Sequence, residues 1–438
     1  MTGMITMPVM FVIYNHLMLQ KFNTHYIQPL RTFNRNARLF LWVTIINGII
    51  LSGWQLFFNI YMLQSGHTRE FLGIVNSMPA LTGLIFGLPL GRFSDRIGRK
   101  QALMIGVAFS SLGYFGQVIF KQPVLIVSMS AISGIFFMLI IVSISPLMMK
   151  LSDASNRTLL FSLNYGLQTI AGAVGSLFAG QLPAVFGTLL HVDATDAVAY
   201  QAVLIVTLCI GTTALIPLWR LHEPETHPTK LEPGFQQPGL RSGLTRLTFK
   251  LALPNFLIGI GAAILIPYMN VFFKDRFAIS DSLLGLIFSL SSLSIAIGSF
   301  IGPILTMRLG DKIRTVAFTQ LGSVVFMLII GFVPSLWIAG FAVLMRAALM
   351  NMSSPLYNAF CMEQTPEGQQ GTASSFLNIA WQVGWSVGPY VSGVVQERYG
   401  FSPLFITTTI LYIIAVGVMW RMFHNAEEIQ AHVNPVMV

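Results

Sequence analysis

The chain has 438 residues, of which 54% are hydrophobic and only 9% are charged, and its mean hydropathy is +0.71. Soluble domains carry roughly 25% charged residues, so this composition excludes an ordinary soluble protein and places the chain in a lipid bilayer. The net charge of +9 does not indicate nucleic-acid binding, because the cations stand in short loops between apolar runs and form no basic stripe.

Residues 1–38 form a first segment that is moderately apolar but interrupted by Asn15, His16, Lys21 and His25. The segment lacks the charged start and the small-residue cleavage site of a signal peptide. We predict a cytoplasmic N-terminal extension, interfacial or disordered, rather than a membrane span.

From Leu39 onward, apolar runs recur with about 20 residues each, the length that a helix needs to cross a hydrocarbon core of about 30 Å. Twelve such runs are found, at residues 39–64, 71–90, 101–120, 123–149, 159–186, 197–219, 251–273, 283–305, 315–333, 336–361, 371–396 and 404–420. The chain is therefore predicted to be an all-α membrane protein with twelve transmembrane helices.

The 25 Lys and Arg residues test this topology, because cations that flank membrane spans stay in the cytoplasm. With twelve spans, 19 of them fall on the side of both termini and Arg346 falls within a span. The five on the opposite side are Arg69, Lys121, Lys274, Arg276 and Arg398. The split predicts a multi-pass protein of the plasma membrane with both termini in the cytoplasm.

The segment between the second and third runs reads Gly-Arg-Phe-Ser-Asp-Arg-Ile-Gly-Arg-Lys over residues 91–100. Its two glycines allow the backbone to reverse, so we expect a tight cytoplasmic hairpin. The spacing Gly-x3-Asp-Arg-x-Gly-Arg-Lys resembles the loop signature of the major facilitator superfamily. The residues to which the resemblance assigns a gating role are Gly91, Asp95, Arg96, Gly98, Arg99 and Lys100.

The longest connection between spans, residues 220–250, is rich in proline and mixed charges, which is typical of a linker. It separates residues 39–219 from residues 251–420, and these two segments repeat each other at an offset of about 210 residues. Matching motifs keep a common order, among them Asn59-Ile-Tyr with Asn270-Val-Phe, Ser145-Pro-Leu with Ser354-Pro-Leu, and Asn164-x3-Gln168 with Asn378-x3-Gln382.

The repeat predicts two pseudo-symmetric six-helix bundles, joined by a cytoplasmic linker and followed by a cytoplasmic tail over residues 421–438. This is the architecture that the resemblance implies. It further implies a substrate site near the middle of the membrane, where the two halves meet.

Neutral amides and aromatic side chains recur inside spans of both halves and are the candidate substrate-binding residues. They are Trp54, Gln55, Asn59, Asn164, Gln168, Tyr268, Asn270, Asn378, Trp381, Gln382 and Trp385. Helix-to-helix hydrogen bonding is the alternative for any one of them. Their recurrence in both halves favours a common central cavity.

Arg346 lies about ten residues into the tenth run, which places a guanidinium near the middle of the membrane. Burying it is costly unless a partner neutralises it. One hypothesis is that Arg346 faces the cavity and binds an anionic or strongly hydrogen-bond-accepting substrate group. The other is that backbone carbonyls, Asn351 or water satisfy it.

In the second half, Asp311 stands where the first half has Arg99, so the carboxylate of the turn has moved. By pseudo-symmetry this turn lies beside the start of the fifth span, where Arg157 stands at a helix N-terminus that disfavours a cation. We predict an ion pair between Arg157 and Asp311. For Asp95, the resemblance implies a contact with the N-terminal end of the eleventh span, residues 371–374, when the cytoplasmic side is closed.

No Asp, Glu or His lies inside a predicted span, so the buried titratable group that is usual in proton coupling is missing. Protons stay a candidate coupling ion through an edge carboxylate such as Asp95 or Glu363. No catalytic motif and no metal-ligand spacing is found, so we expect no enzyme activity, no metal and no cofactor.

We predict secondary transport of a small solute by alternating access, with efflux of amphiphilic or drug-like compounds as the leading interpretation. Gly384-x3-Gly388-Pro389 resembles a motif of exporters in the superfamily, but stands in the eleventh span where exporters carry it in the fifth. The alternatives are a sugar or polyol transporter, an organic-anion transporter if Arg346 faces the cavity, and a non-transporting membrane sensor or scaffold. The expected partners are the substrate and the bilayer, with the chain acting as a monomer.

Overall fold

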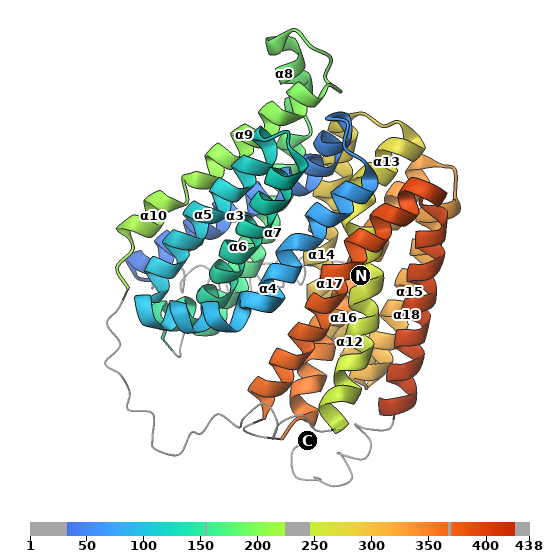
Figure 1. The fold of residues 1–438 in the computed structure, drawn as a ribbon. Helices are drawn as coiled ribbons and strands as arrows, with labels where there is room; N and C mark the ends of the chain where they lie inside the picture. The colour runs from blue at the N-terminus through green and yellow to red at the C-terminus, as the bar shows by residue number, and fades with distance from the viewer. Residues whose placement is uncertain (1–32, 154–155, 224–245, 367–368, 425–438) are drawn as a thin grey trace, which may run out of the picture.

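The computed structural model describes residues 33–153, 156–223, 246–366 and 369–424 (Figure 1). The predicted extension, linker and tail lie mostly outside these ranges. The described residues form helices joined by turns and bends, with no strand among them. The prediction of an all-α chain is confirmed.

The described residues of the first half form eight helices, and each predicted span lies on one or two of them. Their bounds are α3 (Arg35–Gln64), α4 (Arg69–Ile97), α5 (Arg99–Ile119), α6 (Pro123–Leu151), α7 (Arg157–Ala179), α8 (Leu182–Leu190), α9 (Ala197–Thr212) and α10 (Leu215–Arg220). The first span begins at Arg35, four residues before the predicted start, because Asn34 caps the helix by accepting a hydrogen bond from the Ala37 amide.

The second half repeats this arrangement. Its helices are α12 (Arg246–Leu265), the 3-10 helix η2 (Ile266–Tyr268), α13 (Met269–Phe277), α14 (Asp281–Leu309), α15 (Lys312–Phe332), α16 (Leu336–Gln364), α17 (Gln370–Tyr399) and α18 (Ser402–Phe423). The seventh span is broken at η2, where Pro267 has no amide hydrogen to continue the α-helical ladder.

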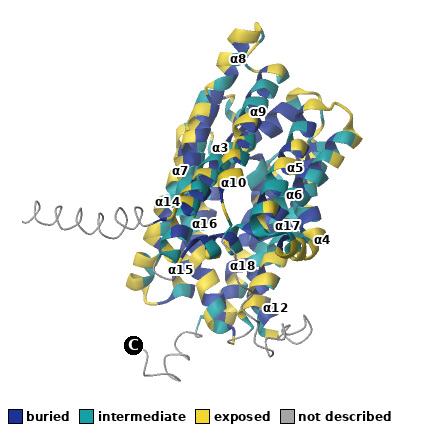
Figure 2. Ribbon diagram, turned by 90° about the vertical axis from the view of Figure 1, so that its left-hand side faces the viewer, coloured by how far each residue is buried: buried dark blue, intermediate teal, exposed yellow. Residues whose placement is uncertain are grey.

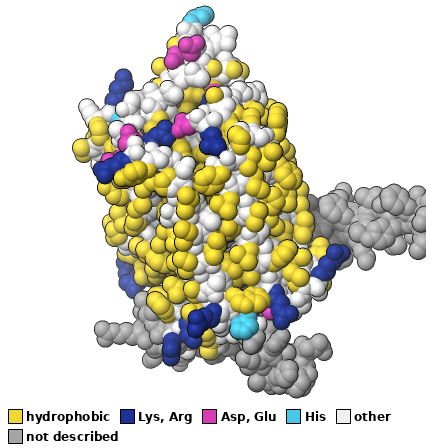
Figure 3. Space-filling model, turned by 90° about the vertical axis from the view of Figure 1, so that its right-hand side faces the viewer, with side chains coloured by type: hydrophobic (Ala, Val, Ile, Leu, Met, Phe, Trp, Pro, Cys, Tyr) yellow, Lys and Arg dark blue, Asp and Glu magenta, His cyan; other side chains and the backbone are white. Residues whose placement is uncertain are grey.

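Eleven helical segments in the described part of the chain are long and apolar enough to cross a membrane. The one predicted span that is not among these eleven is the eleventh in chain order, α17, a helix of 30 residues that carries more amide and hydroxyl side chains than the others. Large apolar side chains such as Phe300 and Trp337, each 75% exposed, lie on outward faces. Exposed residues line the outside of the bundle in Figure 2, and Figure 3 shows an apolar belt with charges gathered toward both ends. The chain is a multi-pass membrane protein.

The two halves meet mainly through α4 against α17 and α7 against α14. They are in contact at the end that carries α13 and diverge toward the end where α10 ends and α12 begins, the two helices on either side of the predicted linker (Figure 1). We call these the far end and the linker end. At the far end the backbones approach closely, because a Cβ on Gly73 would lie 2.6 Å from the Pro389 oxygen and one on Gly285 would lie 2.6 Å from the Ser176 oxygen.

The predicted hairpin at residues 91–100 is wrong in its local form. Helix α4 continues through Gly91 to Ile97, and α5 begins at Arg99, so the chain reverses at Gly98 alone. Gly98 has a φ of 93°, which a residue with a Cβ rarely adopts. Gly310 ends α14 with a φ of 73°, so the repeat between the halves extends to the backbone of this turn.

Candidate functional site

A cavity of about 670 Å³ opens between helices of the second half, and Gln55 of α3 contributes to it from the first half. Its wall combines apolar and aromatic side chains with neutral amides and hydroxyls. The polar and aromatic residues of the wall are Gln55, Asn255, Phe273, Phe288, Ser291, Ser292, Gln320, Arg346, Asn351, Ser353, Ser354, Tyr357, Asn358, Ser374, Asn378, Trp381, Trp385 and Tyr412.

Arg346 lies in this wall, which is the position that the first of the two hypotheses expects. It is the one charged side chain among the described residues that line the cavity. Its Nε has no hydrogen-bond partner, and the Tyr412 hydroxyl lies beside its guanidinium. No hydrogen bond joins Asn351 to Arg346 in the described part of the chain, and Asn351 Nδ2 donates to the Ala347 carbonyl at 2.9 Å.

Four of the predicted neutral residues share the cavity with Arg346. Gln55, Asn378, Trp381 and Trp385 all line it, and the ring centroids of the two tryptophans are 6.2 Å apart. Asn378, Trp381 and Trp385 come from α17, where a spacing of three to four residues places side chains on one face. The polarity of α17 therefore corresponds to the face that it presents to the cavity.

Most of the polar residues of the wall were not predicted from the sequence, among them Ser291 on α14, Gln320 on α15 and Tyr412 on α18. These residues lie in largely apolar spans, and no periodic pattern marks the direction of their side chains. A buried amide such as Gln320 inside a membrane helix is costly, and that cost was the available signal.

Asn59, Tyr268 and Asn270 were predicted to bind substrate, but in this conformation they join helices at the far end. Asn59 Nδ2 donates to the Pro267 carbonyl at 2.5 Å and to Asn270 Oδ1 at 3.3 Å. Asn270 Nδ2 donates to the Leu56 carbonyl at 2.9 Å, and the hydroxyl of Tyr268 donates to a carbonyl within its own half. The repeat-related pair Asn59 and Asn270 thus connects the two halves.

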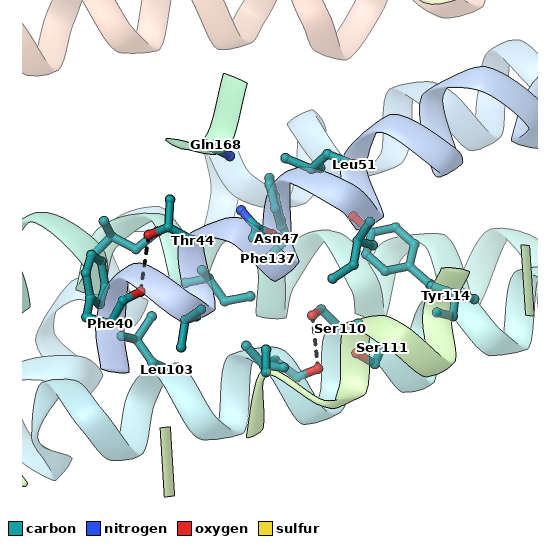
Figure 4. A pocket seen from close by; sticks show the side chains of 18 of the residues that line it. Phe40, Thr44, Asn47, Leu51, Leu103, Ser110, Ser111, Tyr114, Phe137 and Gln168 are labelled. Atoms are coloured by element: carbon teal, nitrogen blue, oxygen red, sulfur yellow. Dashed lines mark hydrogen bonds between the residues drawn. The ribbon is translucent and has the colours of Figure 1, made fainter. Parts of the chain in front are cut away.

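Asn164 and Gln168 line a separate pocket of about 70 Å³ inside the first half. Figure 4 shows this pocket, with Gln168 labelled. Thr44 Oγ1 donates to Asn164 Oδ1 at 2.8 Å. Trp54 stacks on Phe58 with ring centroids 4.2 Å apart and does not line the large cavity.

Gln382 lies outside the large cavity as well, facing α4. Its Nε2 would be 3.4 Å from a Cβ on Gly83. The predicted common cavity is therefore built mainly by the second half.

A comparison of equivalent positions explains this asymmetry. At the offset that aligns Ser145-Pro-Leu with Ser354-Pro-Leu, Arg346 corresponds to Phe137, which lines the small pocket. A phenyl ring fills space and makes no polar contact, whereas a guanidinium carries charge and several donors. The two halves share a fold, but the second holds the charged wall.

A buried ionic cluster closes the far end. Lys274 Nζ lies 2.7 Å from Asp281 Oδ1, and the Tyr200 hydroxyl lies 3.1 Å from both carboxylate oxygens. Tyr200 belongs to the first half, while Lys274 and Asp281 belong to the second. A second pair joins Arg69 of α4 to Asp275 of α13 at 2.7 Å and is more exposed. No sequence pattern marks this cluster, because Asp281 stands at the start of a span like any capping residue.

The predicted gating residues of the linker end bond within their own half. Asp95 pairs with Arg99, and Arg99 Nη1 donates to Ser94 Oγ at 2.9 Å. Arg96 is exposed, and a Cβ on Gly91 would meet nothing within 4 Å. The contact of Asp95 with the start of α17 is not made in this conformation.

Glu223 holds the start of α5 to the end of α6 and of α10 at the linker end. Its carboxylate accepts from the Lys100 amide at 2.8 Å and from Lys150 Nζ at 2.6 Å. Burial raises the pKa of Glu223, but these hydrogen bonds outweigh burial, so its pKa lies below the usual value.

The predicted ion pair between Arg157 and Asp311 is not formed here. Asp311 caps α15 instead, accepting from the amides of Ile313 at 2.6 Å and Arg314 at 3.3 Å. Arg157 Nε has no hydrogen-bond partner. An anion is favoured at a helix N-terminus, which explains why the carboxylate stays with its own helix when the linker end is open.

Comparison with known proteins gives a family match over nearly all of the helical chain. The model of the Major Facilitator Superfamily matches residues 40–253 and, separately, residues 251–435. The two matched ranges correspond to the two halves.

Curated relatives include the multidrug resistance protein MdtG of Proteus mirabilis, 28% identical over 178 residues, which are 39% of this chain and 43% of that protein. MdtG of Salmonella arizonae is 29% identical over 166 residues, which are 36% of this chain and 40% of that protein. The chain thus covers less than half the length of these relatives.

Solved structures with a similar fold include a bacterial homologue of the human lysosomal transporter Spinster in an inward-facing conformation, with a TM-score of 0.72, 14% identity, and coverage of 88% of this chain and 95% of that one. The nucleoside transporter NupG has a TM-score of 0.69 at 15% identity, covering 89% of this chain and 99% of that one. Identities this low show the shared fold alone.

Proposed function

Because the chain belongs to the major facilitator superfamily, we propose that it exports small amphiphilic compounds across the plasma membrane by alternating access. The observation that carries this proposal is the cavity of about 670 Å³, whose wall combines two tryptophans with amides and hydroxyls. Such a mixture of apolar area and few polar groups is typical of sites for drug-sized ligands. The multidrug resistance relatives support the same substrate class.

We assign the linker end to the cytoplasm, since 19 of the cations fall on that side. The conformation described here is then open to the cytoplasm and closed at the far end. Export begins when a compound enters the cavity from the linker end. The linker end then closes, and the far end opens as Tyr200 separates from Asp281 and Arg69 from Asp275.

A flux assay in everted membrane vesicles tests this proposal. The compound panel holds neutral, cationic and anionic amphiphiles together with sugars, and each is measured with and without a pH gradient. We expect accumulation of amphiphiles by vesicles that contain the chain. Accumulation of sugars alone would contradict the proposal, and the absence of any flux at normal expression would favour a sensor or scaffold.

A further inference from the structure

Five unpartnered polar atoms distinguish the wall of the large cavity. Ser291 Oγ, Gln320 Oε1, Arg346 Nε, Trp385 Nε1 and Tyr412 Oη are all buried without a hydrogen-bond partner, and all belong to residues that line this cavity. A buried polar atom left unpaired is costly, because it loses its hydrogen bonds to water and gains none in return. Such a cluster in one wall is consistent with a bound molecule that supplies partners to these side chains.

The charge of the wall selects the kind of molecule. Arg346 makes no ion pair with a described residue, and the cavity lining contains no carboxylate that could neutralise it. The described carboxylates that form ion pairs lie near the ends of the bundle, at Asp95, Glu223, Asp275, Asp281, Asp311 and Glu363. An unpaired guanidinium at membrane depth favours an anion as its partner.

The geometry allows both ends of such an anion to be held. The Tyr412 hydroxyl lies beside the Arg346 guanidinium, so α16 and α18 together present donors to one oxyanion. Arg donors form a planar fork that matches the two oxygens of a carboxylate. Trp381 and Trp385 on α17 supply aromatic area in the same cavity for an apolar body.

We propose that Arg346 and Tyr412 bind the carboxylate of an amphiphilic aromatic acid, so that the cavity prefers organic anions over neutral compounds of equal shape. This inference rests on the proposed function, because it names a substrate class for the same cavity. The neutral amphiphiles still enter the cavity, but they leave the guanidinium unpaired.

Matched ligands test the subsite in the purified full-length chain. Binding of 2-naphthoate and of its neutral isostere 2-naphthamide is measured by calorimetry in detergent. We expect wild type to bind 2-naphthoate at least about tenfold more tightly, because hydrogen bonds between charged groups are stronger than those to a neutral amide. Equal affinity for the two ligands, or no binding of 2-naphthoate, would overturn the proposal.

Variants separate the subsite from the fold. Arg346→Gln should abolish the preference by weakening the binding of 2-naphthoate far more than that of 2-naphthamide. Arg346→Lys should retain part of the preference, because an ammonium lacks the fork. Tyr412→Phe should reduce the preference less. Arg398→Gln removes one positive charge at an exposed far-end position and should leave both affinities as in wild type.

The same preference in Arg346→Gln as in wild type would place the anion elsewhere and overturn the proposal. Vesicle flux distinguishes this failure from failure of the proposed function. Flux of neutral amphiphiles without a preference for carboxylates would support the proposed export and contradict the carboxylate subsite. Tight binding of 2-naphthoate without flux of any compound would support the carboxylate subsite and contradict the proposed export.

Discussion

The far end and the linker end carry the same kinds of side chain but use them differently. At the far end, Tyr200 bonds to Asp281 and Arg69 to Asp275 across the two halves. At the linker end, Asp95 pairs with Arg99 and Lys312 with Glu363, each within one half. Opening the far end must therefore break bonds between the halves, whereas closing the linker end must form new ones.

Distances between spin labels report this difference directly. The native thiols Cys209 and Cys361 are replaced by serine, and cysteines are introduced in pairs that span the two halves. Lys121→Cys with Pro334→Cys reports the far end, and Asp153→Cys with Met307→Cys reports the linker end. All four positions are exposed.

The largest effect is expected from Asp281→Asn, because it leaves the Lys274 ammonium buried without its anion. Breaking a buried pair by removing one partner costs about 3–5 kcal/mol. The side chain of Asp281 is 9% exposed and that of Asp275 is 41% exposed, so Asp275→Asn is the matched control with an expected cost of about 0–1 kcal/mol. Thermal unfolding in detergent measures both, and equal losses would contradict a dominant role for the buried cluster.

Gly73→Leu is expected to hold the far end apart. A Cβ at this position would lie 2.6 Å from the Pro389 oxygen, and overpacking of this kind costs about 1–3 kcal/mol. The far-end label pair should shift to longer distances, and flux should fall. Gly417→Leu serves as the control, because a Cβ there meets nothing within 4 Å. Unchanged far-end distances in Gly73→Leu would show that this contact does not limit closure.

Asp95→Asn is expected to act on the opposite end. If Asp95 contacts the start of α17 when the linker end closes, removing its charge should destabilise the closed conformation by about 0.3–2 kcal/mol. The linker-end pair should then populate long distances more, and flux should slow at normal expression. Unaltered distances and flux would contradict this prediction and would show that Asp95 only pairs with Arg99.

A smaller effect is expected for the pair of Arg157 and Asp311. Asp311 also caps α15, so charge reversal would confound the loss of the cap with the loss of the pair. Asp311→Asn keeps a good capping side chain and removes the charge. Asp311→Asn should change the free-energy difference between the open and the closed linker end by about 0–1 kcal/mol, and the linker-end distances should shift accordingly. Arg157→Gln should have an effect of the same size. Additive effects of the two substitutions would argue against a direct pair, because partners in one interaction couple.

Glu223→Gln is expected to leave both label pairs unchanged, since its bonds lie within the first half. It should lower the melting temperature at pH 7. The pKa of Glu223 is lowered in the folded chain, so its contribution is present above the unfolded pKa of about 4.3 and is lost as the pH falls through the folded value. Wild type and variant should therefore converge in acid, and a constant difference would contradict the assignment.

The sequence predicted the helices, the repeat and part of the cavity for physical reasons that can be named. Span length, cation placement and repeated motifs depend on the bilayer and on the chain alone. Asn378, Trp381 and Trp385 share a helix face by spacing, and α17 is polar enough for that face to be recognised.

Other features depend on packing that a single sequence does not encode locally. Asn59 and Asn270 lie in apolar spans, and only the observed contact between the halves shows that they bond to each other and not to a ligand. Tyr412 and Gln320 line the cavity because of how their helices are oriented about their own axes, which the sequence does not specify. Asp95 pairs with Arg99 and Asp311 caps α15 in the conformation described here, and a sequence does not specify which conformation is adopted.

The central claim is that the two ends open in alternation, and both label pairs measured on one reconstituted sample test it most directly. Without a transported compound, we expect short far-end and long linker-end distances, as in the conformation described here. With a transported compound and a pH gradient, a second population should appear in which the far-end distance is long and the linker-end distance is short. Two distances that lengthen together, or that stay fixed while flux continues, would contradict the account.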